Sequence, residues 1–433
     1  MTSCGRGARN SPRSSSFATA GTVPTGIYTG KPTSSGAGAV LESERTLSGQ
    51  SVEKNEHGEA ELIRRAYEGK LLPAAQVHTF RNTHRMFASR TVRRGRDIHR
   101  LERVHVPLLD LCISSRGADH DLYDYLSRNR TAGLLILKRG RLVLEHYEFG
   151  NDETTRWLSM SMAKSVSTVL IGAAIQDGYI HSLEDPLTRY LPQLLGSAYE
   201  GVSIRHLLQM TSGVRWNDSH TDPMSERRQM LELQIAQQPG AILRYVADQP
   251  RAAPPGTVWN YSTGETHVVG ALLHAATGCW LADYLSEKIW SRLGMEADAT
   301  WWLEAPMGLE VAGSGISATL RDYGRFGLFV MNDGVIDDQR ILPEGWVRES
   351  AAPQEIGGNR VEYGYMWWPV ARKDGSFADQ ALSARGIFGQ FLYINVREEV
   401  VIVVWSSRSK PKGAEAILDN DFFNAVVEAL QNA

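Results

Sequence analysis

Strand-like runs near both ends of the chain, separated by a long helix-like middle, constrain the fold more than any other feature of this sequence. Residues 133–147 read as two apolar strands joined at Arg139-Gly140, a pattern typical of a hairpin. Near the other end, residues 391–395 and 400–405 form a second hairpin pattern. Apolar stretches at helical spacing fill most of the sequence between them. This order predicts an α+β (α/β) chain whose antiparallel sheet is built from both ends, with helices inserted in its middle.

The same pattern divides the chain into segments. Residues 1–50 are rich in Ser, Thr, Gly and Ala without periodicity, and we interpret them as a disordered tail. Residues 51–115 are predicted to be an irregular segment that packs on the core. We assign residues 116–175 and 300–433 to the sheet domain and residues 176–299 to an all-helical domain.

Composition excludes several classes of function. The 433 residues, 42% of them apolar and 22% charged, are ordinary for a globular protein with a large core. The formal net charge of -3 and the lack of a basic stripe argue against nucleic-acid partners. No apolar run has the length of a membrane helix, so we expect no membrane partner. Cys4, Cys112 and Cys279 have no metal-ligand spacing, which favours a reduced compartment without structural zinc.

The N-terminal tail bears on location. Its Arg- and Ser-rich start, without Asp or Glu before Glu42, slightly resembles an organelle transit peptide. It lacks the apolar core of a secretory signal. We favour a flexible extension over a targeting segment, and we expect a cytoplasmic protein.

A Ser-x-x-Lys motif, Ser161-Met-Ala-Lys164, stands at the start of an apolar helix-like run. Three positions apart on a helix, Ser161 and Lys164 share one face, so the amine can meet the hydroxyl. A serine alcohol is a poor nucleophile until a base takes its proton, and a buried lysine can be that base. Ser407-Arg-Ser-Lys410 has the same spacing, but it follows a strand-like run and precedes Pro411. We interpret that second copy as a solvated strand exit.

A hydrolase built on such a pair also needs an acid for the leaving group and donors for the oxyanion. Tyr261 lies in a turn before a helix-like run, where its hydroxyl could face the nucleophile; packing is its alternative role. Residues 383–391 precede an apolar strand, and their glycines allow a close backbone approach to a ligand.

Other catalytic arrangements find no support in the sequence. His267, on an apolar helical pattern, fits a core histidine better than a catalytic one. The G-x-S-x-G elbow, the H-E-x-x-H motif and the nucleotide-binding glycine patterns are absent from the sequence.

Together, these elements resemble the serine β-lactamase and penicillin-binding-protein superfamily. Ser161-Met-Ala-Lys164, Tyr261-Ser-Thr263 and Gly386-Ile-Phe-Gly-Gln390 stand in the family's order and at roughly its spacings. The connecting segments are similar to the class C β-lactamase branch that includes 6-aminohexanoate-dimer hydrolase and related esterases. The resemblance covers about residues 100–430 and implies a β-lactamase-like fold.

The resemblance also implies a role for each matching residue. Ser161 would be the acylated nucleophile, Lys164 its base, and Tyr261 the acid that protonates the departing amine or alcohol. The backbone N–H groups of Ser161 and Ile387 would form the oxyanion hole. The substrate-binding residues implied in the cleft are Gly386, Trp368, His220 and Asp222. The resemblance implies neither a metal nor a cofactor.

Departures from the family pattern bear on the substrate. The family's Lys-Thr-Gly element, which ordinarily helps hold the carboxylate of a β-lactam, is absent, and Gly386-Ile387 stands in its place with Arg385 as a partial substitute. We therefore expect a small-molecule amide or ester as substrate rather than strong β-lactamase activity. The alternatives are a carboxylesterase of the same fold and a non-catalytic ligand-binding domain. A homodimer stays open.

Overall fold

The computed structural model describes residues 52–106, 108 and 110–431, and side-chain surroundings from residue 58 onward. The prediction of a disordered tail at residues 1–50 lies outside the described residues. The chain divides into two units, residues 1–58 and Glu59–Ala433. All the described strands belong to the second unit.

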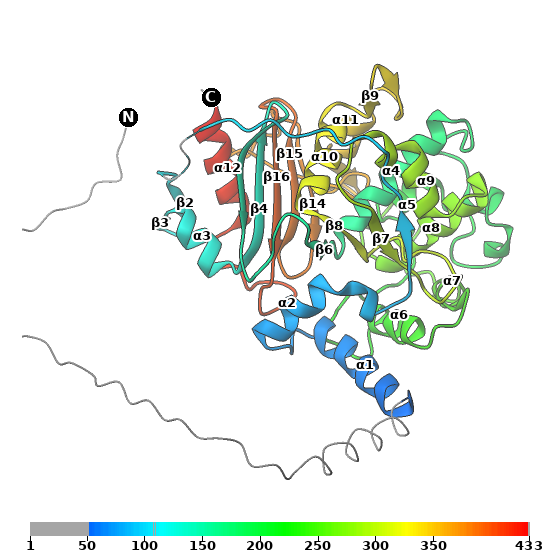
Figure 1. The fold of residues 1–433 in the computed structure, drawn as a ribbon. Coiled ribbons are helices and arrows are strands. Elements are labelled where there is room, and N and C mark those ends of the chain that lie inside the picture. The colour runs from blue at the N-terminus through cyan, green and yellow to red at the C-terminus, as the bar shows by residue number, and fades with distance from the viewer. Residues whose placement is uncertain (1–51, 107, 109, 432–433) are drawn as a thin grey trace, which may run out of the picture. The chain divides into compact units, whose positions relative to one another are not determined.

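A six-stranded antiparallel sheet forms the centre of the second unit (Figure 1). Its order is β13-β14-β15-β16-β4-β5, so strands from the two ends of the sequence pair at β16 and β4. This confirms the sheet predicted from the two groups of strand-like runs. In the order of the sheet, the strands are β13 (Trp368–Pro369), β14 (Ala381–Gly386), β15 (Gln390–Asn395), β16 (Val400–Ser406), β4 (Thr131–Lys138) and β5 (Arg141–Tyr147).

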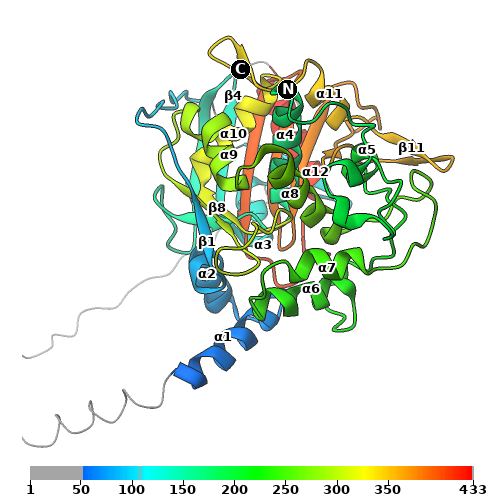
Figure 2. The same ribbon diagram turned by 90° about the vertical axis from the view of Figure 1, so that its right-hand side faces the viewer.

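The central strands are buried along their whole length and mostly apolar because helices cover both faces of the sheet. Every residue of β4 and of β16 is buried, so their sequences are continuous Val, Leu and Ile runs rather than alternating ones. Helices α3 and α12 lie on one face, while α4 and α10 lie on the other (Figures 1 and 2). The face that carries α4 also faces the long helical segment that follows it in the chain.

A second, four-stranded antiparallel sheet was not predicted from the sequence. Its strands are short, and two of them come from segments far apart in the chain, so no local pattern of alternation identifies them. In sheet order they are β1 (Ser89–Val92), β7 (Ala299–Trp302), β8 (Ile316–Thr319) and β6 (Arg156–Leu158). Three two-stranded ribbons complete the strands: β2 (Ile113–Ser115) with β3 (Ala118–His120), β9 (Val335–Ile336) with β10 (Gln339–Arg340), and β11 (Gln354–Ile356) with β12 (Asn359–Val361).

Most of the longer helices follow the predicted apolar spacing, and side-chain caps mark the starts of several helices. Ser203 caps α5 by accepting a hydrogen bond from the His206 N–H, and Ser262 caps α8 in the same way at Glu265. The α-helices are α1 (Val52–Tyr67), α2 (Pro73–Arg81), α3 (Leu122–Arg128), α4 (Met162–Gln176), α5 (Ile204–Leu208), α6 (Glu226–Ile235), α7 (Ala241–Ala247), α8 (Thr263–Thr277), α9 (Leu281–Lys288), α10 (Leu320–Met331), α11 (Trp346–Ser350) and α12 (Asp419–Leu430). Short 3₁₀ turns lie at Thr83–Arg85, Leu187–Arg189, Pro192–Leu194 and Trp290–Arg292.

The segment from α4 to β7 contains helices and isolated bridges but none of the named strands. An all-helical domain with boundaries at residues 176 and 299 stays a prediction. In the part of the chain that the structure describes, no single helix is long and apolar enough to cross a membrane; one bent pair, Thr263–Thr277 with Leu281–Arg292, meets the length and composition criterion.

Candidate active site

Ser161 stands at the turn between β6 and α4, where it is the residue just before the first turn of the helix. The preceding Met160 has a φ of 47°, a left-handed conformation that is costly for a residue with a side chain. Two hydrogen bonds between Ser159 and Ile316 hold this turn against β8. The Ser159 N–H donates to the Ile316 carbonyl over 2.7 Å, and Ser159 Oγ accepts from the Ile316 N–H over 3.1 Å. The nucleophile candidate is therefore fixed by a strained turn that is bonded to the sheet.

Lys164 lies one helical turn further along, and only 1% of it is exposed. Its Nζ is 3.0 Å from Ser161 Oγ and donates to the Gly313 carbonyl over 3.1 Å. Burial lowers the pKa of Lys164 to about 7, and the charges of Arg227 and Lys412 add to that effect. A large fraction of this amine is thus neutral near pH 7 and able to accept the serine proton.

Tyr261 is placed by the turn before α8 and faces the same two side chains. The Ser161 side chain interacts with it and favours the ionised phenol, and Lys164 Nζ lies 5.1 Å from its ring centroid. Burial raises the pKa of Tyr261, and the negative charge of Asp218 raises it further. Trp368 stacks on the ring with centroids 6.0 Å apart. The phenol stays protonated at neutral pH and can donate to a leaving group.

Asp218 is a member of the site that the sequence interpretation did not identify. Its Oδ1 accepts hydrogen bonds from Trp216 Nε1 and from the Thr263 N–H, over 2.8 and 2.9 Å. Its Oδ2 is buried and has no hydrogen-bond partner among the described residues. Burial works against the charged form, but interactions with His220, Lys164 and Arg227 hold the pKa of Asp218 below its usual value. The carboxylate therefore supplies a fixed negative charge beside Lys164 and Tyr261.

The end of β14 brings a backbone N–H close to the nucleophile. A Cβ on Gly386 would lie 2.5 Å from the Ser159 carbonyl oxygen, so only glycine lets β14 approach the turn this closely. Ile387 follows directly and lines the same pocket as Ser161. Among the described residues, neither the Ser161 N–H nor the Ile387 N–H has an intramolecular acceptor. Both are available as oxyanion donors.

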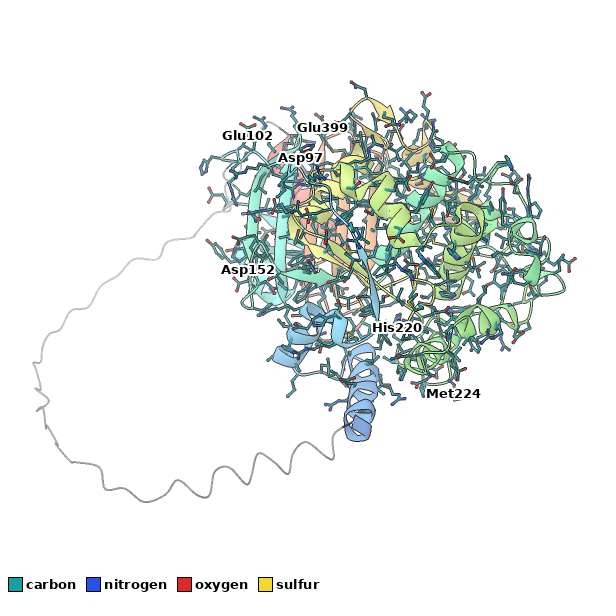
Figure 3. All side chains as sticks on the ribbon, turned by 45° about the vertical axis from the view of Figure 1, so that its right-hand side comes forward. Asp97, Glu102, Asp152, His220, Met224 and Glu399 are labelled. Carbon is teal, nitrogen blue, oxygen red and sulfur yellow. The ribbon has the colours of Figure 1, made fainter. Side chains whose placement is uncertain are left out.

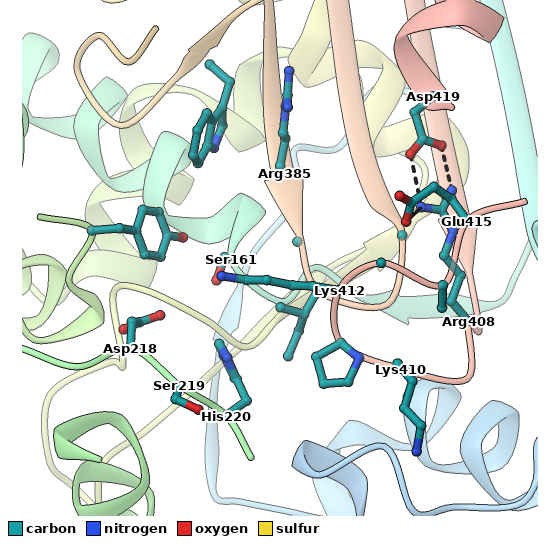
Figure 4. A pocket seen from close by; sticks show the side chains of 18 of the residues that line it. Ser161, Asp218, Ser219, His220, Arg385, Arg408, Lys410, Lys412, Glu415 and Asp419 are labelled. Atoms are coloured by element: carbon teal, nitrogen blue, oxygen red, sulfur yellow. Dashed lines mark hydrogen bonds and ion pairs between the residues drawn. The ribbon is translucent and has the colours of Figure 1, made fainter. Parts of the chain in front are cut away.

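A pocket of about 1220 Å³ opens over Ser161 (Figure 4). Trp368, Gly386 and His220, three of the residues implied to bind substrate, line this pocket. The assignment of Asp222 is not supported, because this side chain instead accepts hydrogen bonds from Asn217 Nδ2 and the Met224 N–H and does not line the pocket. It shapes the loop that carries Asp218 and His220.

His220 is inside the molecule, whereas Met224, on the same loop, is exposed (Figure 3). Burial lowers the pKa of His220 to about 3, so the imidazole is neutral at physiological pH. It cannot serve as a cationic substrate anchor there, and its place in the pocket is that of a neutral wall residue.

The strand exit after β16 forms another wall of the pocket. The prediction that it is solvated is right for Ser409 and Lys410, which are exposed, and wrong for the two residues before them. Ser407 and Arg408 are buried, and the guanidinium of Arg408 is bound by Asp419 and lies close to Glu415. Lys410 Nζ donates to the Gly69 carbonyl over 3.1 Å. Arg408 is buried because the acidic first turn of α12, which begins at Asp419, packs against it.

Lys412 belongs to the same exit but extends into the pocket. Its side chain reaches toward Ser161 in Figure 4, and its Nζ lies 6.0 Å from the Tyr261 ring centroid. No carboxylate of the described residues is within ion-pair distance of it. Arg385 also lines the pocket, bonded to Ser383 Oγ and lying 5.2 Å from the Trp368 ring centroid, but it points away from Ser161 (Figure 4). Of these two side chains, Lys412 rather than Arg385 lies toward the nucleophile.

A buried amine bonded to a serine hydroxyl, a phenol on the other side and two backbone donors together make an arrangement suited to acyl transfer. The described residues contain no group of three His, Cys, Asp or Glu side chains that could hold a metal ion. The chain belongs to the beta-lactamase family, whose model matches residues 122–422. The resemblance drawn from the sequence motifs is confirmed by this match.

The chain is also similar to individual relatives and solved structures. The chain is 28% identical to 6-aminohexanoate-dimer hydrolase of Paenarthrobacter ureafaciens over 310 residues, which cover 67% of this chain and 76% of the relative. A solved Bacillus anthracis structure, also named for 6-aminohexanoate-dimer hydrolase, is 25% identical with a TM-score of 0.70 and covers 82% of this chain and 93% of its own. The hydrolase EstCE1, described as having promiscuous acyltransferase activity, shares the fold at 16% identity and a TM-score of 0.54, over 72% of this chain and 96% of its own.

Proposed function

We propose that this chain is a serine hydrolase that cleaves small linear amides or esters through an acyl-enzyme on Ser161. The observation that carries the proposal is the buried Lys164 amine, 3.0 Å from the Ser161 hydroxyl and with a pKa of about 7. A lysine that is half neutral near pH 7 and already bonded to the serine is suited to be its general base. Membership of a family of hydrolases supports the same conclusion.

In the proposed reaction, Lys164 accepts the hydroxyl proton while Ser161 Oγ bonds to the substrate carbonyl carbon. The carbonyl oxygen becomes an oxyanion and is held by the N–H groups of Ser161 and Ile387. Tyr261 gives its proton to the departing amine or alcohol as the bond to carbon breaks, and it regains a proton from Lys164. Water then enters from the pocket, gives a proton to the same pair and bonds to the acyl carbon. The bond from that carbon to Ser161 Oγ breaks, the pair returns the proton to Oγ, and the acid leaves.

The charges of the pocket favour a substrate with a carboxylate. Arg408 is neutralised by Asp419, and Lys410 is bonded to the Gly69 carbonyl, so neither is free for a ligand. Lys412 has no such partner among the residues that the structure describes, and it reaches toward Ser161 (Figure 4). A linear amide with a terminal carboxylate, such as the 6-aminohexanoate dimer that names the relative, would place its charge against this ammonium.

Ester cleavage is the second candidate, and the same residues support it. An alkoxide leaves more easily than an amine, so an ester depends less on protonation by Tyr261. The Lys-Thr-Gly element is absent from the sequence, so we expect turnover of a cephalosporin to be weak.

The proposal is tested by measuring turnover of a p-nitrophenyl acyl ester, the linear 6-aminohexanoate dimer and a chromogenic cephalosporin. Wild type and Ser161→Ala are compared side by side. We expect ester or dimer turnover that is lost in Ser161→Ala, and the ratio of the two rates ranks amide against ester. Absence of turnover for all three, together with no fluorophosphonate label on Ser161, would instead favour the non-catalytic ligand-binding domain.

A further inference from the structure

The last residue of α1, Tyr67, is buried against the loop and helix that flank the active site, although it lies well before the region matched by the family model. Only 1% of Tyr67 is exposed. Its ring is nearly parallel to that of His220, with centroids 6.2 Å apart, and Arg227 Cζ lies 4.8 Å from its centroid. Tyr67 and the active site belong to the same unit, Glu59–Ala433.

Ion pairs attach the end of α1 to the helix that carries Arg227. Arg64 binds Glu232 with two parallel hydrogen bonds of 2.9 and 2.7 Å, and Glu68 accepts from Arg228 over 2.8 Å. Both partners lie on α6. A bidentate guanidinium–carboxylate interaction fixes the orientation of the two side chains as well as their distance. The end of α1 is therefore held on α6, and the Tyr67 ring has a defined position over Arg227.

The chain that follows Tyr67 contacts the opposite side of the pocket. Gly69 accepts a hydrogen bond from Lys410, and Gln76 Nε2 donates to the Arg408 carbonyl over 2.8 Å. Phe80 packs against Phe388, the neighbour of Ile387, with ring centroids 5.4 Å apart. Residues 59–81, which we call the N-terminal arm, therefore join α6 to the two segments that supply Ile387 and Lys412.

Arg227 is the link between Tyr67 and the reacting groups. It is 3% exposed and lines a small cavity next to Ser161 together with Tyr67, His220 and Thr263. No carboxylate of the described residues lies within ion-pair distance of its guanidinium, yet its charge acts on Lys164 and Asp218. A buried cation without an ionic partner needs another source of stabilisation, and the face of an aromatic ring provides it.

We infer that Tyr67 is a positioning residue of the active site, whose ring holds Arg227 and His220 beside Ser161. The inference rests on the proposed hydrolase function. The Tyr67 hydroxyl is buried without a hydrogen-bond partner among the described residues. The aromatic face, and not the hydroxyl, therefore carries the role. The N-terminal arm is thus part of the catalytic structure rather than an appendage to the family fold.

Loss of the ring has a defined electrostatic consequence. Without it, Arg227 can move toward water, and its repulsion of the protonated Lys164 weakens. Water that enters the space also reduces the desolvation of Lys164. Both changes raise the pKa of Lys164, so the acid limb of kcat/KM moves to higher pH.

The test compares four full-length variants on a neutral p-nitrophenyl ester that wild type hydrolyses. We expect Tyr67→Ala to lower kcat/KM by roughly 10- to 100-fold, because small displacements of a catalytic group have effects of that size, and to move the acid limb upward. Tyr67→Phe should stay within about twofold of wild type, since an unpaired buried hydroxyl contributes little. Tyr67→Leu keeps apolar volume without a π face and should behave as Tyr67→Ala. It covers the case in which the alanine variant does not fold.

The control variant is Ile63→Ala, because Ile63 is a buried residue of the same arm. It measures the effect of lost stability alone and should leave the pH profile unchanged.

Two results would overturn the inference while the hydrolase function stands. One is a pH profile and kcat/KM for Tyr67→Ala and Tyr67→Leu that match those of Ile63→Ala. The other is a loss in Tyr67→Phe as large as that in Tyr67→Ala, which would assign the role to the hydroxyl. Failure of the proposed function is distinguishable, since wild type itself would then show no turnover dependent on Ser161.

Discussion

Lys164 connects a measurable pH profile to a single buried side chain. Its pKa is about 7 because burial disfavours the ammonium, and only the neutral amine can accept the Ser161 proton. The proposed mechanism therefore predicts an acid limb of kcat/KM near pH 7, with activity rising as the pH increases through it. Lys164→Ala should lower kcat/KM by roughly 10²- to 10⁴-fold, the usual contribution of a general base. A bell-shaped or rising profile that is identical in wild type and Lys164→Ala would assign the base elsewhere.

Asp218 provides a second test at the same residue scale. Its charge stabilises the protonated form of Lys164 and so keeps the pKa of that amine higher than burial alone would. In Asp218→Asn the amide oxygen can still accept from Trp216 and Thr263, so the loop is retained while the charge is lost. We expect the acid limb to move to lower pH, opposite to its direction in Tyr67→Ala. A shift upward in Asp218→Asn would contradict this electrostatic assignment.

Lys412 is predicted to select substrates by charge. The comparison is made well above the acid limb, where the effect of Lys412 on the pKa of Lys164 no longer changes the rate. There, Lys412→Met should lower kcat/KM about tenfold or more for an amide with a terminal carboxylate, equivalent to roughly 1.4 kcal/mol, and should leave its methyl ester unchanged. Lys410→Met is the matched control, because Lys410 lines the same pocket but donates to the Gly69 carbonyl. Equal losses on both substrates, or in both variants, would rule out selection by this charge.

Residues with a chemical signature could be predicted from the sequence, whereas those placed by loops could not. Ser161 and Lys164 stand at helical spacing, and the structure brings them together with Tyr261. Asp218 and Asp222 lie four residues apart in a polar loop without periodicity, so the sequence did not indicate which one faces the pocket. Lys412 was missed because it lies in an exposed segment after β16, and the sequence does not show that the fold turns this segment toward Ser161.

At the scale of elements, helix α8 carries a buried carboxylic acid, Glu265, whose ionisation destabilises the folded protein. Glu265 accepts a hydrogen bond from Ser212 Oγ over 2.5 Å, and its other oxygen has no partner among the described residues. Burial raises the pKa of Glu265 to about 8 from its ordinary 4.5. Because the folded-state pKa is the higher one, this group's contribution to stability is complete below about pH 4.5 and is lost as the pH rises through 8.

Glu265→Gln should therefore change the pH dependence of stability. Relative to wild type, the free energy of unfolding of the variant should increase with pH between about 5 and 8, by up to roughly 1.4 kcal/mol per pH unit. Urea denaturation of both proteins at pH 5, 7 and 9 measures this difference directly and cancels the titration of other groups. A difference that is constant across the three pH values would show that Glu265 is ionised in the folded protein.

The long regular elements could be predicted from the sequence, and the short ones could not. The run that forms α8 and the runs that form β4, β5, β15 and β16 have enough apolar positions to reveal their period. Strand β1 has four residues and pairs with β7 about two hundred positions later, so its conformation is decided by a distant partner. The second sheet was missed for this reason, whereas residues 51–115 were predicted only as an irregular segment that packs on the core.

At the scale of the whole molecule, one buried ion pair joins three distant segments. Asp419, at the start of α12, accepts from Arg408 after β16 and from Tyr125 of α3. Asp419→Ala leaves the buried Arg408 guanidinium without its main partner and should lower the free energy of unfolding by about 3–5 kcal/mol. Glu428 lies on the same helix, α12, and forms an exposed ion pair with Lys373. Glu428→Ala breaks that pair and should lower the free energy of unfolding by less than about 1 kcal/mol. Equal effects in a denaturation experiment would contradict this role of the pair.

The central claim is that Ser161 becomes acylated with the help of Lys164, and trapping the acyl-enzyme tests it most directly. The protein is mixed with a slowly deacylating p-nitrophenyl ester, quenched in acid, digested and analysed by mass spectrometry. We predict one acyl group on the peptide that contains Ser161, formed far more slowly in Lys164→Ala and absent in Ser161→Ala. An adduct on a different residue, or hydrolysis that continues in Ser161→Ala, would contradict the account.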